Sequence, residues 1–458
     1  MDRRSRRNYF WVYFICAYIA LTGIVLGDPS TILDGFIAIY HDNAVLITDY
    51  VGLAGISAAF LNVALVTFFS AVLLRINNVP MHGRSLFTLG LMAGFACFGK
   101  NIYTMWPIIF GSFLLSAVCK VRFRKYLISG LLATSLGPLV GVAYLSDGGG
   151  LLGWTYAIII GSAIGFILPL LAAHTNGVLR GLNLYNGGFA VGLMALVFVP
   201  IMQDLGFSFE TQGYWATGYN GRFSIWLYIT AIGFIIAGKI ADPDHAFENY
   251  RNILKRPGVA KDDFTELDGM GAVLVNMGVN TIICTTYLLL IGGDFNGATM
   301  GGIFTIIGFS ANGKHAKNIS IIILGIFLGS LVNPSATPTT HGVQMGTFLG
   351  TTLAPMAGTY GLPGGILSGV FHSFAILKIS QSYAGANLYN NGFCGGIISV
   401  MFYPVCNKFF KTNTYSEPSP SMRKERTRSS KNTISGKLIA AAEEKKEEFM
   451  KESAKETK

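Results

Sequence analysis

The polar residues best suited to bind a ligand stand in a motif that occurs twice. Asn-Leu-Tyr-Asn-x-Gly-Phe occupies residues 183–189 and again 387–393, each time within an otherwise apolar stretch. Its two asparagines are three positions apart, so on a helix they share one face. Because burying amides and a phenol without partners is costly, each copy must face a solute pathway or bond to a neighbouring helix. The candidates are Asn183, Tyr185, Asn186, Asn387, Tyr389 and Asn390.

Two lysines form a second pair. Lys100 and Lys314 each end a Gly-Phe-x-x-x-Gly-Lys segment, after an apolar stretch of about 15 residues. Such a stretch makes roughly 22 Å of helix, short of the roughly 30 Å hydrocarbon core. We therefore expect half-helices or re-entrant segments here. Each lysine either extends along a helix end to the membrane surface or faces a solute.

Further paired polar residues lie in or beside apolar spans. A histidine and then a basic residue precede each copy of the motif: His174 with Arg180, and His372 with Lys378. Asn62 and Asn276 each lie deep in a long apolar span. These asparagines either bond neighbouring helices or contact solute. The basic residues favour an anionic solute.

Two proline segments predict interrupted helices. Leu-Gly-Pro-x-x-Gly spans residues 136–141, and Leu-Ala-Pro-x-x-Gly spans 353–358. Proline frees a backbone carbonyl and kinks a helix. Hydroxyls just upstream could bond the freed backbone groups or contact solute. They belong to Thr134, Ser135, Thr351 and Thr352.

The composition indicates an all-α polytopic membrane protein. Of the 458 residues, 51% are apolar and 13% charged, against about 25% charged in soluble domains. Many apolar stretches reach the roughly 20 residues that span a bilayer. The net charge of +10 lies in loops and the tail, where membrane proteins carry basic residues, so we expect membrane lipid rather than nucleic acid as a partner. The chain lacks a Gly-x-x-x-x-Gly-Lys-Ser/Thr loop, and we expect no cofactor and no metal.

The chain is a duplication. An offset of 214 residues aligns residues 10–114 with the second half without a gap, and polar, glycine and proline positions recur. Later, His174–Arg180 matches His372–Lys378 after a smaller offset, which predicts a six-residue insertion before the second motif. Each half offers seven apolar spans. They are residues 9–27, 51–74, 85–99, 104–119, 126–145, 152–173 and 181–203, then 223–241, 269–292, 298–313, 318–333, 343–358, 362–377 and 387–407.

Loop charges indicate that the halves cross the membrane in opposite directions. Residues 28–50 carry no Lys or Arg, whereas the equivalent loop 242–263 carries four. The pattern reverses in two other loop pairs: 75–84 and 120–125 are basic, and 292–297 and 333–341 are not. Basic loops stay in the cytoplasm, so an inverted repeat with fourteen crossings follows, with both termini cytoplasmic.

These patterns divide the chain into three regions. They are transmembrane repeat 1 (8–205), transmembrane repeat 2 (222–409) and a charged cytoplasmic tail (410–458). The tail holds twelve basic and eight acidic residues, which predicts a solvated segment, with residues 434–455 able to form a helix.

With the doubled motif in view, the chain resembles an uncharacterised family of bacterial membrane proteins that carry two copies of a domain of unknown function. The resemblance extends to about residue 409 and implies no activity. A weaker similarity is to urea transporters, through Leu-Tyr-Asn-Gly at 184–187 and Asn-Asn-Val-Pro at 77–80. The second half departs from that pattern, with Asn391 in place of glycine, so no site residue is carried over. The predicted arrangement of seven spans in each half is similar to the nucleobase and sulfate transporter fold. This similarity concerns the architecture only, and a shared fold does not imply a shared function.

These features favour a transporter or facilitator of a small polar solute, working by alternating access in the cytoplasmic membrane. A homo-oligomer is compatible with this interpretation. Two alternatives stay open. One is a membrane enzyme that uses His174 or His372 on a lipid-linked substrate, which the symmetric duplication of polar residues disfavours. The other is a sensor that signals through the tail.

Overall fold

A computed structural model describes residues 3–45, 48–210 and 213–423. Within that part every regular element is a helix, beside one isolated bridge between Asp263 and Asn312. Apolar stretches of this length form helices because lipid offers no partner for backbone groups, which must bond within the segment.

The first half of the chain contains nine α-helices in its described residues. They are α1 (Arg3–Leu26), α2 (Ile32–Tyr40), α3 (Tyr50–Ile76), α4 (Gly83–Ala96), α5 (Ile102–Val118), α6 (Leu127–Ala133), α7 (Gly137–Leu145), α8 (Leu151–Leu179) and α9 (Asn186–Asp204). The second half follows as α10 (Asn220–Ala241), α11 (Ala246–Ile253), α12 (Phe264–Leu267), α13 (Gly269–Leu290), α14 (Gly297–Phe309), α15 (Ala316–Val332), α16 (His341–Gly350), α17 (Ala354–Ile379) and α18 (Asn390–Phe409).

Eight helical segments of the described part are long and apolar enough to cross a membrane, against fourteen predicted spans. The difference has three sources. Four predicted spans correspond to the shorter helices α4, α5, α14 and α15. Residues 343–358 and 362–377 fall within one candidate span, His341–Tyr383, although the non-helical Gly361 separates the two. The last predicted span corresponds to α18, whose first turn carries Asn390 and Asn391 and which is not among the eight.

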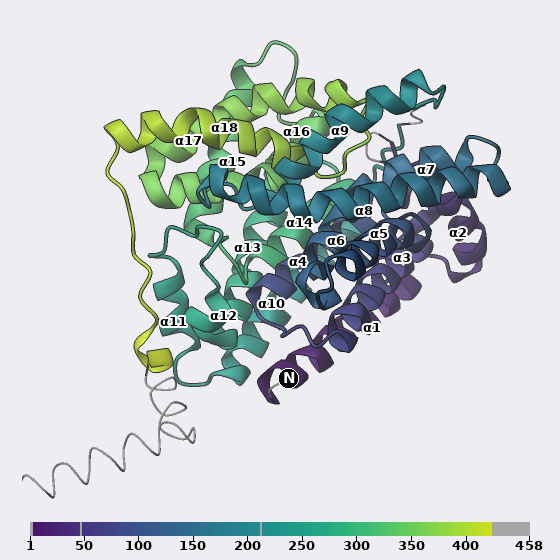
Figure 1. Cartoon of the computed structure of the whole chain (residues 1–458). Coiled ribbons are helices and arrows are strands. Elements are labelled where there is room, and N and C mark those ends of the chain that lie inside the picture. The colour runs from purple at the N-terminus through teal and green to yellow at the C-terminus, as the bar shows by residue number, and fades with distance from the viewer. Residues whose placement is uncertain (1–2, 46–47, 211–212, 424–458) are drawn as a thin grey trace, which may run out of the picture.

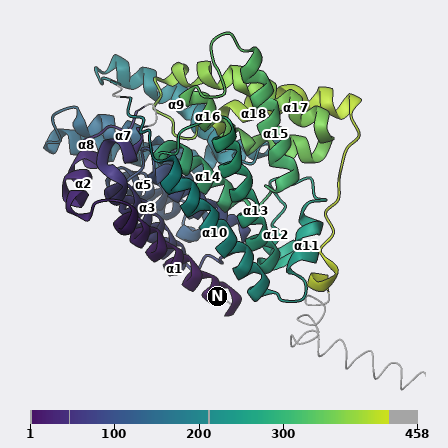
Figure 2. The same cartoon turned by 180° about the vertical axis from the view of Figure 1, so that it is seen from behind.

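The two halves pack against each other through equivalent helices (Figure 1). Figure 2 shows α1 beside α10, where Trp226 donates to the Thr22 hydroxyl at 3.1 Å. The short helices α4 and α14 cross in the centre. A Cβ added at Gly90 of α4 would lie 2.5 Å from the Cα of Gly308 on α14, so this crossing requires glycine. The core therefore contains an interface between the two halves, which we call the seam. It is formed where α4 packs on α14 and α9 packs on α18.

Backbone breaks recur at equivalent positions. Gly55 interrupts α3 with φ 78°, and Gly269, 214 residues later, begins α13 with φ 86°. These left-handed conformations favour glycine. The two halves therefore share this break in the chain path.

The same comparison corrects the predicted insertion. After α8, Arg180 and Gly181 have φ 51° and 76°; after α17, Ala384 and Gly385 have φ 49° and 73°. The offset here is 204 (384 − 180), as it is for the motif. On this register His174 corresponds to Lys378, and His372 corresponds to Leu168. The prediction of a six-residue insertion is wrong, because the sequence match of the two histidines follows local similarity rather than helix register.

The second copy is instead shorter. The two proline segments are 217 residues apart (353 − 136), whereas the two motifs are 204 residues apart. The second copy therefore has thirteen fewer residues (217 − 204) between its proline segment and its motif. In the first copy these residues help to build the turn between α7 and α8. In the second copy this turn is reduced to one kink inside α17, at Gly361, whose φ of 70° is not helical.

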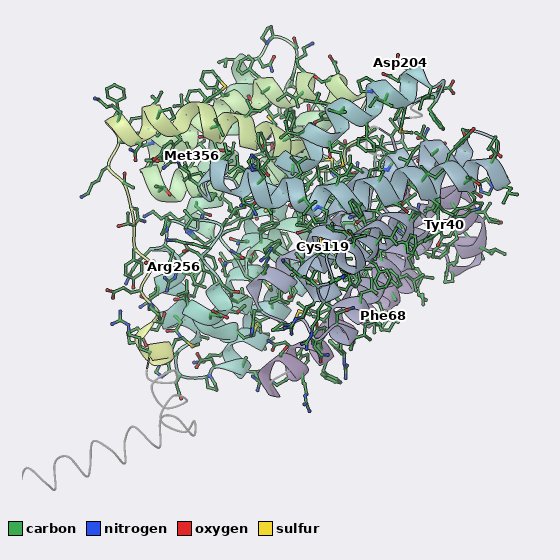
Figure 3. The ribbon with its side chains drawn as sticks, in the orientation of Figure 1. Tyr40, Phe68, Cys119, Asp204, Arg256 and Met356 are labelled. Atoms are coloured by element: carbon green, nitrogen blue, oxygen red, sulfur yellow. The ribbon has the colours of Figure 1, made fainter. Side chains whose placement is uncertain are left out.

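The start of the tail binds the loop between α10 and α13 of the second half, a contact that the sequence did not predict. Residues 411–423 descend from α18 to α11, and Figure 3 places Arg256 beside this segment. Arg256 is buried and donates to Asp268 through two nitrogens, both at 2.7 Å. Its guanidinium also donates to the Glu417 carbonyl, and the Ser419 hydroxyl donates to Asp268 at 2.6 Å. Residues 424–458, including the predicted helix, lie outside the described residues.

The buried pair yields a first prediction. Asp268→Asn leaves the Arg256 guanidinium buried without a counter-charge, which costs about 3–5 kcal/mol. We expect a markedly lower melting temperature of the detergent-solubilised protein in a thermal unfolding assay. Glu417→Gln is the control, because that carboxylate is 68% exposed in its pair with Arg423. Equal melting temperatures for the two variants would contradict this role.

Candidate functional site

The two copies of the motif meet where α9 crosses α18. A Cβ at Gly188 would lie 2.9 Å from the Cα of Gly392, and a Cβ at Gly392 would lie 2.8 Å from the Cα of Gly188. The rings of Phe189 and Phe393 stack at 5.7 Å. Glycine at both positions lets the helices touch, so each copy does face the other.

Each motif also binds the interrupted helix of the other half. The Leu184 amide donates to the Thr352 carbonyl at 2.9 Å, and the Leu388 amide donates to the Ser135 carbonyl at 3.1 Å. Ser135 and Thr352 are equivalent (352 − 135 = 217), so the two contacts are reciprocal. The Asn183 side chain adds a bond between the two motifs by donating to the Gly392 carbonyl at 2.8 Å.

The hydroxyls of the interrupted helices mainly bond the backbone. The breaks are short 3-10 turns, Thr134–Leu136 and Thr351–Leu353. Thr134 donates to the Leu131 carbonyl at 2.6 Å and Ser135 to the Leu132 carbonyl at 2.8 Å. Thr351 bonds the Phe348 carbonyl, whereas Thr352 donates to the Asn183 side chain. The freed backbone groups are thus bonded within the turn or across the seam.

Asn62 and Asn276 position the two lysine turns. Asn62 donates to the carbonyls of Ala96 and Lys100, both at 2.8 Å. Asn276 donates to the equivalent carbonyls of Ser310 and Lys314, at 2.8 and 2.7 Å. Each amide therefore joins a long helix to the turn after a short one. The sequence left two roles open for these asparagines, bonding a neighbouring helix or contacting solute. In the structure both side chains bond the turn after a neighbouring helix.

Both lysine side chains are fully buried, which excludes the alternative that they extend to the membrane surface. The Lys314 amine donates to the Tyr185 hydroxyl at 2.7 Å, and that hydroxyl donates to Thr305 at 3.2 Å. Among the described residues, the Lys100 amine has the Met92 sulfur at 3.5 Å and the Phe95 ring at 5.0 Å as its polar and cation–π contacts. The two equivalent amines thus have different surroundings.

A row of aromatic rings from both halves lies between these amines. The rings of Tyr185 and Tyr389 are 5.0 Å apart. Tyr185 contacts the Phe309 ring at 4.8 Å, and Tyr389 contacts the Phe95 ring at 5.2 Å. We call the six residues the lysine–tyrosine cluster: Phe95, Lys100, Tyr185, Phe309, Lys314 and Tyr389.

Neither lysine of the cluster forms an ion pair within the described residues. Two of the buried carboxylates are already bonded elsewhere. Asp49 accepts from the amides of Ala216 and Gly297, at 2.7 and 2.8 Å, and Asp268 binds Arg256. A third, Asp262, lies in the loop before α12, where burial raises its pKa to about 6. A buried ammonium group without an anion is strongly disfavoured, and such an amine is charged only when an anion binds beside it. The described residues supply no such anion to either lysine of the cluster.

Several amide atoms near the seam are also buried without a hydrogen-bond partner in the described part. They include Asn186 Oδ1, Asn276 Oδ1, Asn280 Oδ1 and Asn387 Nδ2. Asn390 Oδ1 accepts from the Tyr383 hydroxyl. Asn280 was not a sequence candidate, although it lies four residues after Asn276 and so on the same helix face. Unpaired polar atoms of this kind call for water or a solute.

The histidine and basic candidates lie apart from the cluster. His174, Arg180 and Lys378 are exposed, and Arg180 donates to the Tyr403 hydroxyl at 3.1 Å. His372 is buried in α17 with both ring nitrogens unpaired among the described residues, and its Cε1 atom lies close to Gly350. The structure therefore brings together the motif, lysine and asparagine candidates and separates most of the others.

A substitution at the crossing gives a second prediction. Gly392→Ala places a Cβ 2.8–3.0 Å from atoms of Gly188 and Tyr185, so α9 and α18 must separate. Overpacking of this kind costs about 1–3 kcal/mol, and we expect a lower melting temperature. Gly177→Ala in α8 is the matched control, because its Cβ meets no atom within 4 Å and alanine favours helix. If the control were destabilised as much as Gly392→Ala, the close crossing would not explain the effect.

The comparisons with known proteins agree with the duplication. One family model, described as a protein of unknown function (DUF1576), matches the chain twice, at residues 28–204 and 242–408. No curated protein and no solved structure matches the chain. The two matches confirm the predicted resemblance, and together they cover most of the chain. The protein belongs to the DUF1576 family and carries two copies of its domain.

Proposed function

We propose that this membrane protein transports a small anionic solute by alternating access between its two repeats. The observation that carries the proposal is the pair of equivalent lysines, Lys100 and Lys314, buried at the seam without a carboxylate in the described residues. A carboxylate or phosphate on the solute would supply the anion that the buried amines lack. Tyr185 and Tyr389 would add hydroxyls beside the solute, and Phe95 and Phe309 would exclude water.

The difference between the two lysines supports an alternating mechanism. Lys314 is bonded to Tyr185, whereas the equivalent Lys100 lacks a bond to Tyr389 and contacts Met92. In a duplicated carrier the two halves can exchange conformations. The exchanged state would pair Lys100 with Tyr389 and release Lys314 from Tyr185. A solute bound between the amines would then be transferred from one half to the other.

We further propose that the repeats lie in opposite orientations, related by a two-fold axis in the membrane plane. Reciprocal contacts, such as Leu184 with Thr352 and Leu388 with Ser135, are what a two-fold relation produces. Opposite charge bias in three loop pairs supports inversion relative to the membrane. Both termini would then lie in the cytoplasm.

Uptake into proteoliposomes tests the transport proposal. The panel is phosphate, sulfate, small mono- and dicarboxylates, and urea as a neutral solute. We expect uptake of at least one anion, and Lys100→Gln and Lys314→Gln each to reduce it at least about 10-fold, as loss of a buried charge partner does. Lys408→Gln removes an exposed charge at the end of α18 and should leave uptake unchanged. No anion uptake, or uptake insensitive to both lysines, would overturn the proposal.

Cysteine labelling tests the inversion. Cys119 is the exposed cysteine among the six, so Cys119→Ser removes the reactive background. Single cysteines then replace Ser30 and Asp244, which are exposed in equivalent loops. We expect a membrane-impermeant maleimide to label the two positions from opposite sides of the membrane. Labelling of both from one side would exclude the inverted arrangement.

A further inference from the structure

A basic hollow lies on the surface of the first repeat, apart from the lysine–tyrosine cluster. It encloses about 620 Å³ between the turn after α3 and the turn after α5. Its lining is Asn78, Val79, Pro80, Val121, Arg122, Arg124 and Lys125. We call it the basic hollow.

The three cations of the hollow lack counter-ions. Arg122, Arg124 and Lys125 are exposed, and none forms an ion pair in the part of the chain that the structure describes. The chain has no Asp or Glu between Asp49 and Asp147. The hollow therefore concentrates positive charge that no nearby acid in this stretch of sequence neutralises.

The backbone around the hollow is fixed in place. The Tyr9 hydroxyl of α1 donates to the Val79 carbonyl at 2.7 Å, and Asn8 donates to the Met81 carbonyl at 3.0 Å. These bonds anchor one wall to the first helix. The wall that Asn78, Val79 and Pro80 form is therefore held against α1, and the three cations line the rest of the hollow.

Helix-end electrostatics does not account for the cations. Basic residues near helix C-termini are common because they offset the helix dipole. The equivalent helix ends of the second repeat, however, carry Gly292, Gly293 and Asp294 in one turn, and Ser335, Ala336, Pro338 and Thr339 in the other. Since those ends lack any cation, the fold does not require one here. The positive-inside rule favours basic residues in this loop, but it does not require a cavity between them.

Exposed apolar side chains lead directly to the hollow. At the ends of α3 and α5, Ile76 is 66% and Val118 is 69% exposed, and Phe113, one turn earlier on α5, is 50% exposed. In a membrane protein such a surface contacts acyl chains. A hollow at its edge therefore sits at headgroup depth, where basic pockets bind anionic lipid.

We propose that the basic hollow binds the phosphate headgroup of an anionic phospholipid, with the acyl chains along α5. Phosphate chemistry alone would also fit a free ion, but the adjoining apolar surface favours the lipid. Arginine side chains bind phosphate oxygens bidentately, so Arg122 and Arg124 would hold the headgroup, with Lys125 adding charge. This proposal does not depend on which solute the protein moves.

The test compares lipid binding to the full-length, detergent-solubilised protein. The probes are phosphatidylglycerol, phosphatidylcholine and inorganic phosphate, with bound lipid counted by native mass spectrometry. The test variant combines Arg122→Gln, Arg124→Gln and Lys125→Gln. The control combines Arg251→Gln, Lys261→Gln and Lys408→Gln, which removes the same charge from other exposed positions.

We expect the wild type and the control to bind phosphatidylglycerol and the test variant to bind it roughly 100-fold more weakly, since each basic group near an anionic lipid contributes strongly. Arg122→Lys with Arg124→Lys should keep most of the charge attraction, which separates binding from a folding defect. Equal binding by wild type and test variant, or equal binding of phosphatidylcholine, would overturn the proposal. Displacement of the lipid by millimolar phosphate would identify a free-phosphate site instead and would also overturn it.

Discussion

The close crossing of α9 and α18 is the constraint on which the rest of the structure depends. At Gly188 and Gly392 the two backbones touch, and each motif then reaches the interrupted helix of the opposite half. Those backbone bonds place Tyr185 and Tyr389 between the lysine turns. A larger side chain at either glycine would separate the helices and disperse the cluster. A membrane interface of this kind depends on small residues because lipid gives no hydrophobic drive for helices to associate.

The lysine turns show how the fold holds a costly group in place. Each turn follows a short helix, and one asparagine from a long helix bonds its two carbonyls. The backbone is thereby satisfied, whereas the amine is not matched by a carboxylate in the described residues. Buried polar groups are normally paired, and the cost of leaving these amines without a carboxylate is the basis of the proposal that they bind an anionic solute.

Duplication produced two similar halves that are not identical in detail. His372 replaces Leu168, and Asn391 replaces Gly187, so the second repeat buries polar groups where the first has apolar or small ones. The basic hollow lies on the first repeat. In the described residues the start of the tail bonds to the second repeat, both at the buried Arg256–Asp268 pair and at Gly358 and Thr359 of α17. The symmetric part of the molecule forms the seam, and the asymmetric parts distinguish its two faces.

The sequence by itself determined the membrane class, the helical content and the duplication. Apolar length forces helices in lipid, and recurring glycine, proline and asparagine positions reveal a repeat without any knowledge of contacts. It also identified the motif residues, because paired amides in an apolar span must find partners. It also indicated that α4 and α14 are too short to cross the hydrocarbon core. Other helix boundaries were less accessible, since apolar composition alone does not show where a helix breaks.

Only the tertiary structure decided which of these residues meet. Asn183 and Gly392 are 209 positions apart, and no local pattern pairs them. The same Gly-Phe-x-x-x-Gly-Lys segment suits a lysine at the membrane surface or a buried one, and burial followed from the packing of the opposite half over it. The predicted correspondence of His174 with His372 is wrong, because it rested on the similarity of a few residues. The register of the packed helices instead aligns His174 with Lys378. Local sequence specifies the helices and their breaks, whereas contacts between distant segments determine which polar groups are left unpaired at the seam.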